Sequence, residues 1–131
     1  MIKFISVIAL LSCPATTWAE SSNNAHNEQI TKIINEYREE CREGVNALLI
    51  SGEEINTTTS IQGEITTIVL GSFECEGEGH LWCGSGGCHV DVVVGDKRFE
   101  PMLLLHEPPT SVSYENGILS LRKEGFEWNN R

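Results

Sequence analysis

Residues 73–94 read FECEGEGHLWCGSGGCHVDVVV, and this segment decides how the chain is held together. It contains three cysteines, one tryptophan and two histidines, and it ends in a run of valines that is typical of a buried strand. Two of the cysteines flank the glycine-rich residues 84–87. No catalytic or cofactor motif is recognisable in the segment, so it indicates a cross-linked fold rather than an activity.

Residues 1–19 have the layout of a cleavable export signal. Lys3 precedes an apolar run at 4–11, and Thr17 and Ala19 place small residues at the −3 and −1 positions of a cleavage site. The apolar run is shorter than the roughly 18 residues that span a membrane. We therefore expect cleavage after Ala19 and a periplasmic or secreted protein, with no stable membrane span in the mature chain.

The same N-terminus has one alternative, a lipoprotein. Residues 10–13, LLSC, could form a lipoprotein box in which Cys13 is lipidated and retained at the membrane. Pro14 and the early position of this cysteine favour plain cleavage.

Cleavage leaves four cysteines, Cys41, Cys75, Cys83 and Cys88. An even number in a small exported chain indicates two disulfides, and three pairings are possible. The glycines at 84–87 favour a bridge between Cys83 and Cys88, because glycine adopts the positive φ values of a tight loop without a Cβ clash. Cys41 would then pair with Cys75, and closing that loop of about 35 residues contributes roughly 3 to 4 kcal/mol of stability through chain entropy.

The charge balance limits the choice of partner. The chain has 19 acidic and 9 basic residues, a formal net charge of −10, and the signal carries one of the basic residues and no acidic one. Nucleic acid is disfavoured as a partner because phosphate binding needs clustered Lys and Arg. Only Asp91 and Asp96 are aspartates, so the side chains that favour calcium loops are scarce. The acidity provides solubility, and it would attract a basic protein or a cationic ligand.

The first regular element after the signal is predicted to be an amphipathic helix. Apolar side chains recur at positions 30, 33, 34, 37 and 41, the spacing of one helical face. Asn24 or Asn27 can cap its start, and Gly44 can end it. Residues 20–26 lack an apolar period and are expected to be a flexible lead-in to a single domain at 27–131.

Beyond residue 45 the apolar period shortens to that of strands. Strands are expected at 45–50, 57–60, 65–70, 89–94, 97–100, 112–114, 119–121 and 126–128, with 102–106 as a short edge or loop strand. Two-residue turns are expected at Gly95-Asp96 and Asn116-Gly117, and a further turn at Gln62-Gly63. The predicted class is α+β: an N-terminal helix packed on a five- or six-stranded antiparallel sheet, stapled by disulfides.

Three features resemble a loosely defined group of small exported bacterial proteins of unknown function. They are Cys41 on the first helix, FEC at 73–75, and LWCGSGGC at 81–88 before a valine-rich strand. The resemblance covers about half of the chain, and it implies export and this architecture but no activity. Members of the group often carry an Asp-rich, calcium-loop-like turn before the first hairpin. Residues 57–67 contain no Asp here, so a metal role is not carried over.

Thiolate and imidazole side chains make a zinc site a hypothesis for this chain. The candidate ligands are Cys75, His80, Cys83, Cys88 and His89. Their spacing contains no pair of CxxC knuckles, and an oxidising compartment would consume the thiols as disulfides. We therefore expect neither a metal nor a cofactor.

No catalytic residue is predicted. Glu76, Glu78 and His80 could supply acid–base groups, but they alternate with glycines in a loop, and catalysis needs positioned groups. Ser85 lies between glycines without the strand-to-helix context of a nucleophile. His106 is interpreted as a surface residue.

The candidate partner-binding residues are Glu74, Glu76, Glu78, Leu81 and Trp82. The three glutamates concentrate negative charge, and the two apolar side chains offer an anchor beside a disulfide, where little entropy is lost on binding. In the alternative interpretation, the tryptophan is buried against the helix and the glutamates are only solvated, because tryptophan is highly buried on average.

These observations favour an exported acidic binding module, for example an inhibitor or immunity protein of a basic cell-wall hydrolase. One alternative is a periplasmic hydrolase or metal-handling protein that uses His80 and His89, and another is a structural envelope protein. The charge makes a basic protein the expected partner.

We predict that the exported protein is cleaved after Ala19 and contains both disulfides. Its intact mass should equal that of the cleaved chain minus the hydrogen atoms that the cysteines lose when two disulfides form. Peptide mapping should recover Cys83 linked to Cys88, and Cys41 linked to Cys75. Free thiols at Cys83 or Cys88 in the folded, metal-free protein would contradict this pairing.

Overall fold

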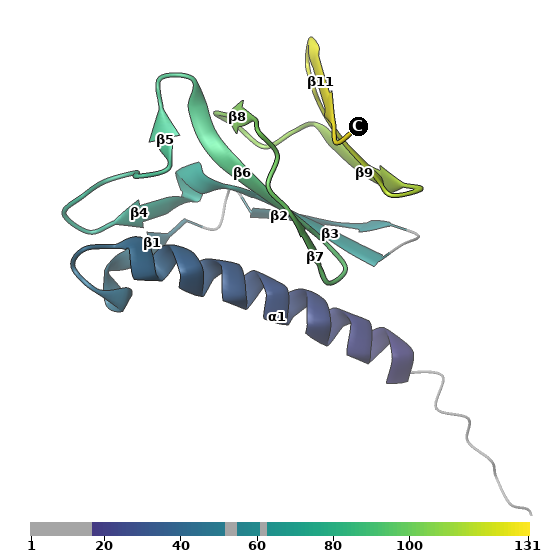
Figure 1. Ribbon diagram of the computed structural model, residues 1–131, viewed down its shortest axis with the longest axis horizontal. Helices are drawn as coiled ribbons and strands as arrows, with labels where there is room; N and C mark the ends of the chain where they lie inside the picture. Colours follow the sequence, from purple (N-terminus) through teal and green to yellow (C-terminus); the bar gives the residue numbers. More distant parts are fainter. Residues whose placement is uncertain (1–16, 52–54, 61–62) are drawn as a thin grey trace, which may run out of the picture.

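The computed structural model describes residues 17–51, 55–60 and 63–131 and has an α+β fold. One helix, α1 (Thr17–Glu40), lies along one face of an antiparallel sheet, and the C-terminal strands lie on the opposite side of that sheet (Figure 1). The predicted class, a helix packed on an antiparallel sheet with two disulfides, is confirmed.

The remaining elements are short and follow one another with few long connections. They are η1 (Val45–Ala47), β1 (Leu48–Ile50), β2 (Ile55–Ser60), β3 (Gly63–Val69), η3 (Leu70–Ser72), β4 (Phe73–Cys75), β5 (Cys83–Gly84), β6 (Gly87–Val94), β7 (Lys97–Phe99), β8 (Leu104–Leu105), β9 (Ser111–Glu115), β10 (Ile118–Lys123) and β11 (Phe126–Asn129).

The strands of the described residues are divided among three sheets. The six-stranded sheet has the order β2-β3-β6-β5, with β7 and β8 also paired to β6. β9, β10 and β11 form a separate meander, and β1 pairs with β4. The predicted sheet of five or six strands therefore agrees with the central sheet. The separate C-terminal meander and the β1–β4 pair were not predicted. Three prolines lie outside the strands in the segment between β7 and β9: Pro101, Pro108 and Pro109.

β6 separates two apolar cores. On one face of the strand, Val90, Val92 and Val94 pack toward the C-terminal meander with Leu119. Val93 points the other way and packs in the core that α1 covers. Each fully buried side chain of this kind stabilises the fold by roughly 1.5 to 3 kcal/mol relative to its exposed state.

Both predicted disulfides are present. Cys41, directly after α1, is bonded to Cys75 at the end of β4, with a Cα–Cα distance of 5.4 Å. Cys83 of β5 is bonded to Cys88 of β6, its direct partner in the strand register, at 4.0 Å. The first bridge fixes the C-terminal end of the helix, and the second closes the loop at 84–87.

The helix begins earlier than predicted. It starts at Thr17 and includes residues 20–26, which were expected to be a flexible lead-in. Within this part of the helix the ring of His26 is buried against the sheet: Nδ1 donates to the carbonyl oxygen of Gly95 at 2.7 Å, and Nε2 lies 2.7 Å from the hydroxyl oxygen of Thr66. The other end also differs, because α1 stops at Glu40 instead of continuing to Gly44.

The turn predictions were accurate where the structure describes the residues. Asn116 and Gly117 have φ values of 52° and 78°, as a type I′ turn requires, and Gly95 has a φ of 58°. Gly63 has a φ of 113° directly opposite Ser60, while the preceding position of that predicted turn lies outside the described residues.

We predict that Gly117→Val lowers the free energy of unfolding by about 1 to 3 kcal/mol, because valine is strained at positive φ. No atom lies within 4 Å of the added Cβ, so steric contact does not contribute. Gly84→Val is the matched control, since that position also has open space and no positive φ; its effect should stay within about 0.5 kcal/mol. Equal melting temperatures for the two variants would contradict the turn assignment.

Candidate functional site

A cavity of about 380 Å³ opens between α1, β6 and the segment that follows β7. Tyr37 and Trp82 form aromatic parts of its wall, and Asp91 of β6 reaches it from the sheet. Glu100 and Met102 contribute from the segment after β7. The cavity therefore combines aromatic, acidic and apolar groups in one place.

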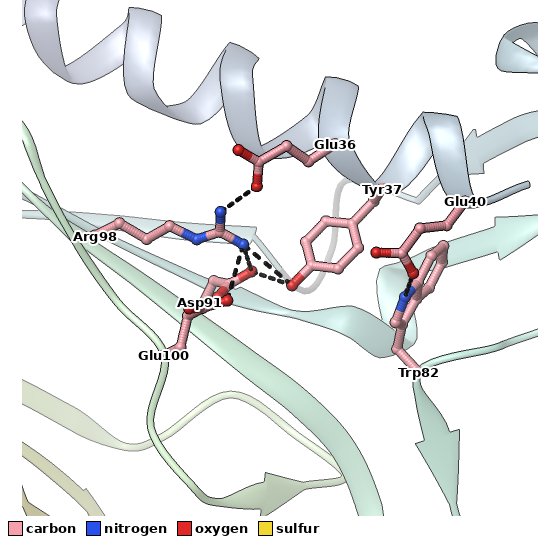
Figure 2. A network of polar contacts seen from close by, with 7 residues as sticks. All are labelled: Glu36, Tyr37, Glu40, Trp82, Asp91, Arg98 and Glu100. Atoms are coloured by element: carbon pink, nitrogen blue, oxygen red, sulfur yellow. Dashed lines mark hydrogen bonds and ion pairs between the residues drawn. The ribbon is translucent and has the colours of Figure 1, made fainter.

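Asp91 is the centre of a polar network beside the cavity (Figure 2). The Tyr37 hydroxyl donates to Asp91 Oδ2 at 2.5 Å, and Arg98 Nη2 donates to the same oxygen at 3.3 Å. Arg98 also pairs with Glu36 of α1 and, at 3.3 Å, with Glu100. A single guanidinium thus meets three carboxylates that come from three parts of the chain.

Burial sets the ionisation of this network. The Asp91 side chain is 2% exposed, and burial raises its pKa, while the hydrogen bond from Tyr37 and the charge of Arg98 oppose that increase. Burial also raises the pKa of Tyr37, and its contact with Asp91 adds to the effect. Burial alone would lower the pKa of Arg98, but hydrogen bonds and charges from Glu36 and Asp91 raise it. Tyr37 therefore remains a donor and Arg98 a cation.

Trp82 is held as a rigid wall. Its side chain is buried, with the residue 8% exposed, and its Nε1 donates to Glu40 Oε2 at 2.7 Å. Its ring lies edge-on to those of Tyr37 and Phe73, with centroid distances of 5.0 and 6.2 Å. Geometry of this type is favourable for aromatic pairs. Trp82 is therefore not an exposed anchor, and its packing follows the alternative interpretation in which it is buried against the helix.

The other predicted partner-binding residues lie away from the cavity. Glu78 accepts a hydrogen bond from the backbone N–H of Arg42 at 2.8 Å, which ties the loop to the end of the helix. Glu74 and Glu76 are exposed, and Leu81 is exposed beside Trp82. Of the five predicted residues, only Trp82 lines the cavity.

The candidate zinc ligands take part in other contacts. All four cysteines of the described ranges are bonded in disulfides. Within those ranges, no group of three or more His, Cys, Asp or Glu side chains is placed to hold a metal ion. His80 instead has its Nδ1 within 3.1 Å of the carbonyl oxygen of Phe73, and His89 is exposed at the cavity.

Four residues in or beside the cavity were not predicted: Asp91, Arg98, Glu100 and Met102. A signal existed for the first of these, because a lone aspartate inside a run of valines indicates a buried charge with a partner. The partner lies across the two-residue turn, where Val93 of β6 is paired with Arg98 of β7. Glu100 and Met102 had no such signal.

Comparison with known protein families, curated proteins and solved structures finds no match to this chain. Among the described residues, no helix is both long and apolar enough to cross a membrane.

We predict that Arg98→Met lowers the free energy of unfolding by about 3 to 5 kcal/mol, because it leaves the buried charge of Asp91 without its cation. Arg122→Met is the matched control. Arg122 pairs with Glu127 on the surface, and losing such a pair costs at most about 1 kcal/mol. In the Asp91→Asn variant, adding Arg98→Met should lower the free energy of unfolding by less than Arg98→Met does alone.

Denaturant unfolding of the four variants measures these differences. If Arg98→Met lowers the free energy of unfolding by no more than Arg122→Met does, the network around Asp91 is not essential to the fold.

Proposed function

We propose that this protein is an exported binding module for a basic protein. The observation that carries the proposal is the pair of carboxylates that line the cavity, Asp91 and Glu100, both of which contact Arg98. Beside these groups, Met102 is 98% exposed, which is unusual for a large apolar side chain next to a cavity. An acidic hollow with an apolar rim suits a partner that presents cationic and apolar groups together.

Several other observations support export and binding. The two disulfides fit an oxidising compartment, as does the signal layout of residues 1–19. The formal charge of −10 would steer a basic protein toward this chain. The resemblance to small exported bacterial proteins, which rests on residues 73–75 and 81–88, points to the same compartment.

Within this class, we propose a basic cell-wall hydrolase as the partner, with the protein acting as its inhibitor or immunity protein. Such enzymes share the compartment, and a cationic enzyme surface complements the acidic one. The cavity chemistry supports binding more than catalysis, because Asp91 is neutralised by Arg98 and Tyr37 has a raised pKa that makes it a poor acid.

The test is association of the purified mature protein with a panel of basic cell-wall hydrolases, a c-type lysozyme among them. We expect binding with an association rate that falls by roughly tenfold or more between low and physiological salt. The same hydrolases after succinylation of their lysines serve as controls and should not bind. Lytic activity should decrease when the protein is added. Absence of binding across the panel at low salt would refute the proposal.

A further inference from the structure

Building on the proposed function, we infer that the cavity receives a lysine or arginine side chain of the basic partner. Glu100 pairs with its charge at the opening, Asp91 Oδ1 accepts a hydrogen bond from it at the inner end, Tyr37 forms the wall beside it, and Met102 and Leu104 cover its aliphatic stem. The volume of about 380 Å³ lies in the usual range for sites that enclose a small group, roughly 300 to 1,000 Å³.

The carboxylates are placed to accept a second cation besides Arg98. Both hydrogen bonds to Asp91 reach Oδ2, so its Oδ1 has no donor among the described residues. Glu100 is 69% exposed, whereas Arg98 is mostly buried behind it. A cation that approaches from solvent therefore meets Glu100 first and finds Asp91 at the inner end, in surroundings where water screens their charges less.

The aromatic wall suits a cation and is already rigid. The guanidinium carbon of Arg98 lies 5.9 Å from the centroid of the Tyr37 ring, and Tyr37 also lines the cavity. Asp91 holds the Tyr37 hydroxyl, and Glu40 holds the Trp82 indole, so neither ring has to be ordered when a ligand binds. Pre-ordered walls reduce the entropy lost on binding.

The rim suits the stem of the incoming side chain. Met102 and Leu104 are exposed and border the cavity. Lysine and arginine carry their charge on a chain of methylene groups, which packs along apolar surface while the charged head reaches a polar partner. His89 also borders the cavity.

The first experiment uses small probes and the indole N–H NMR signal of Trp82, in protein lacking residues 1–19. Trp128→Phe identifies which of the two remaining indole signals belongs to Trp82. We expect saturable shifts with N-acetyl-arginine amide and N-acetyl-lysine amide, and at least about fivefold weaker binding of the uncharged N-acetyl-citrulline amide. Equal binding of the citrulline probe would overturn the inference.

The second experiment measures the basic hydrolases against matched variants. Glu100→Gln should weaken binding by about fivefold, whereas Glu124→Gln, the same charge change on the C-terminal meander, should not. Met102→Ser should weaken binding by about threefold, whereas Phe126→Ser, which alters another exposed apolar side chain, should not. Melting temperatures of all four variants show that the fold is retained.

The outcomes separate this inference from the proposed function. If the hydrolases bind and neither Glu100→Gln nor Met102→Ser differs from its control, the cavity assignment fails while the proposed function stands. If no hydrolase binds but the charged amides do, the proposed function fails. The cation would then come from a free ligand and not from a partner protein.

Discussion

The fold depends on how the buried carboxylate of Asp91 is satisfied. This residue lies in the middle of β6, the strand that pairs with four others in the central sheet. A buried charge without a partner is strongly destabilising. Arg98 reaches it from the adjacent strand, and Tyr37 reaches it from α1, so the sheet and the helix must both be in place. The position of α1 is therefore fixed by hydrogen-bonding geometry as well as by apolar packing.

At several positions, polar and covalent contacts attach the helix to the rest of the domain, among them those of His26, Tyr37 and Cys41. His26 contacts the β6–β7 turn and β3, Tyr37 contacts β6, and Cys41 is bonded to β4 directly beyond the last helical turn. The spacing of 26, 37 and 41 follows the same helical face that carries Ile30 and Ile33. Three different kinds of interaction, a hydrogen-bonded imidazole, an ion-pair network and a disulfide, thus hold one face of one helix against the sheet.

The same network shapes the candidate site. Because Arg98 is shared among three carboxylates, the region near the cavity retains excess negative charge after the buried aspartate has been neutralised. The rigidity needed for the fold also orders the wall of the cavity, since Tyr37 and Trp82 are both fixed by carboxylates. The segment after β7 follows Arg98 directly, which brings Glu100 and the exposed Met102 to the opening. Stability and the proposed recognition therefore rely on the same contacts.

The sequence by itself determined the features that depend on local geometry. The apolar spacing of the helix, the alternation of Val90, Val92 and Val94, and the turn at Asn116-Gly117 follow from the periods of helix and strand and from allowed φ values. The sequence favoured one of three disulfide pairings, because a glycine-rich loop closes a short bridge without Cβ clashes, and the structure contains that pairing. Only the tertiary structure decided the rest: whether Trp82 points outward or inward, whether residues 20–26 are ordered, how the strands divide into sheets, and where a cavity opens. Each of these depends on contacts between distant residues, such as Trp82 with Glu40 or His26 with Gly95, and local sequence patterns carry no information about which distant surface a side chain will meet.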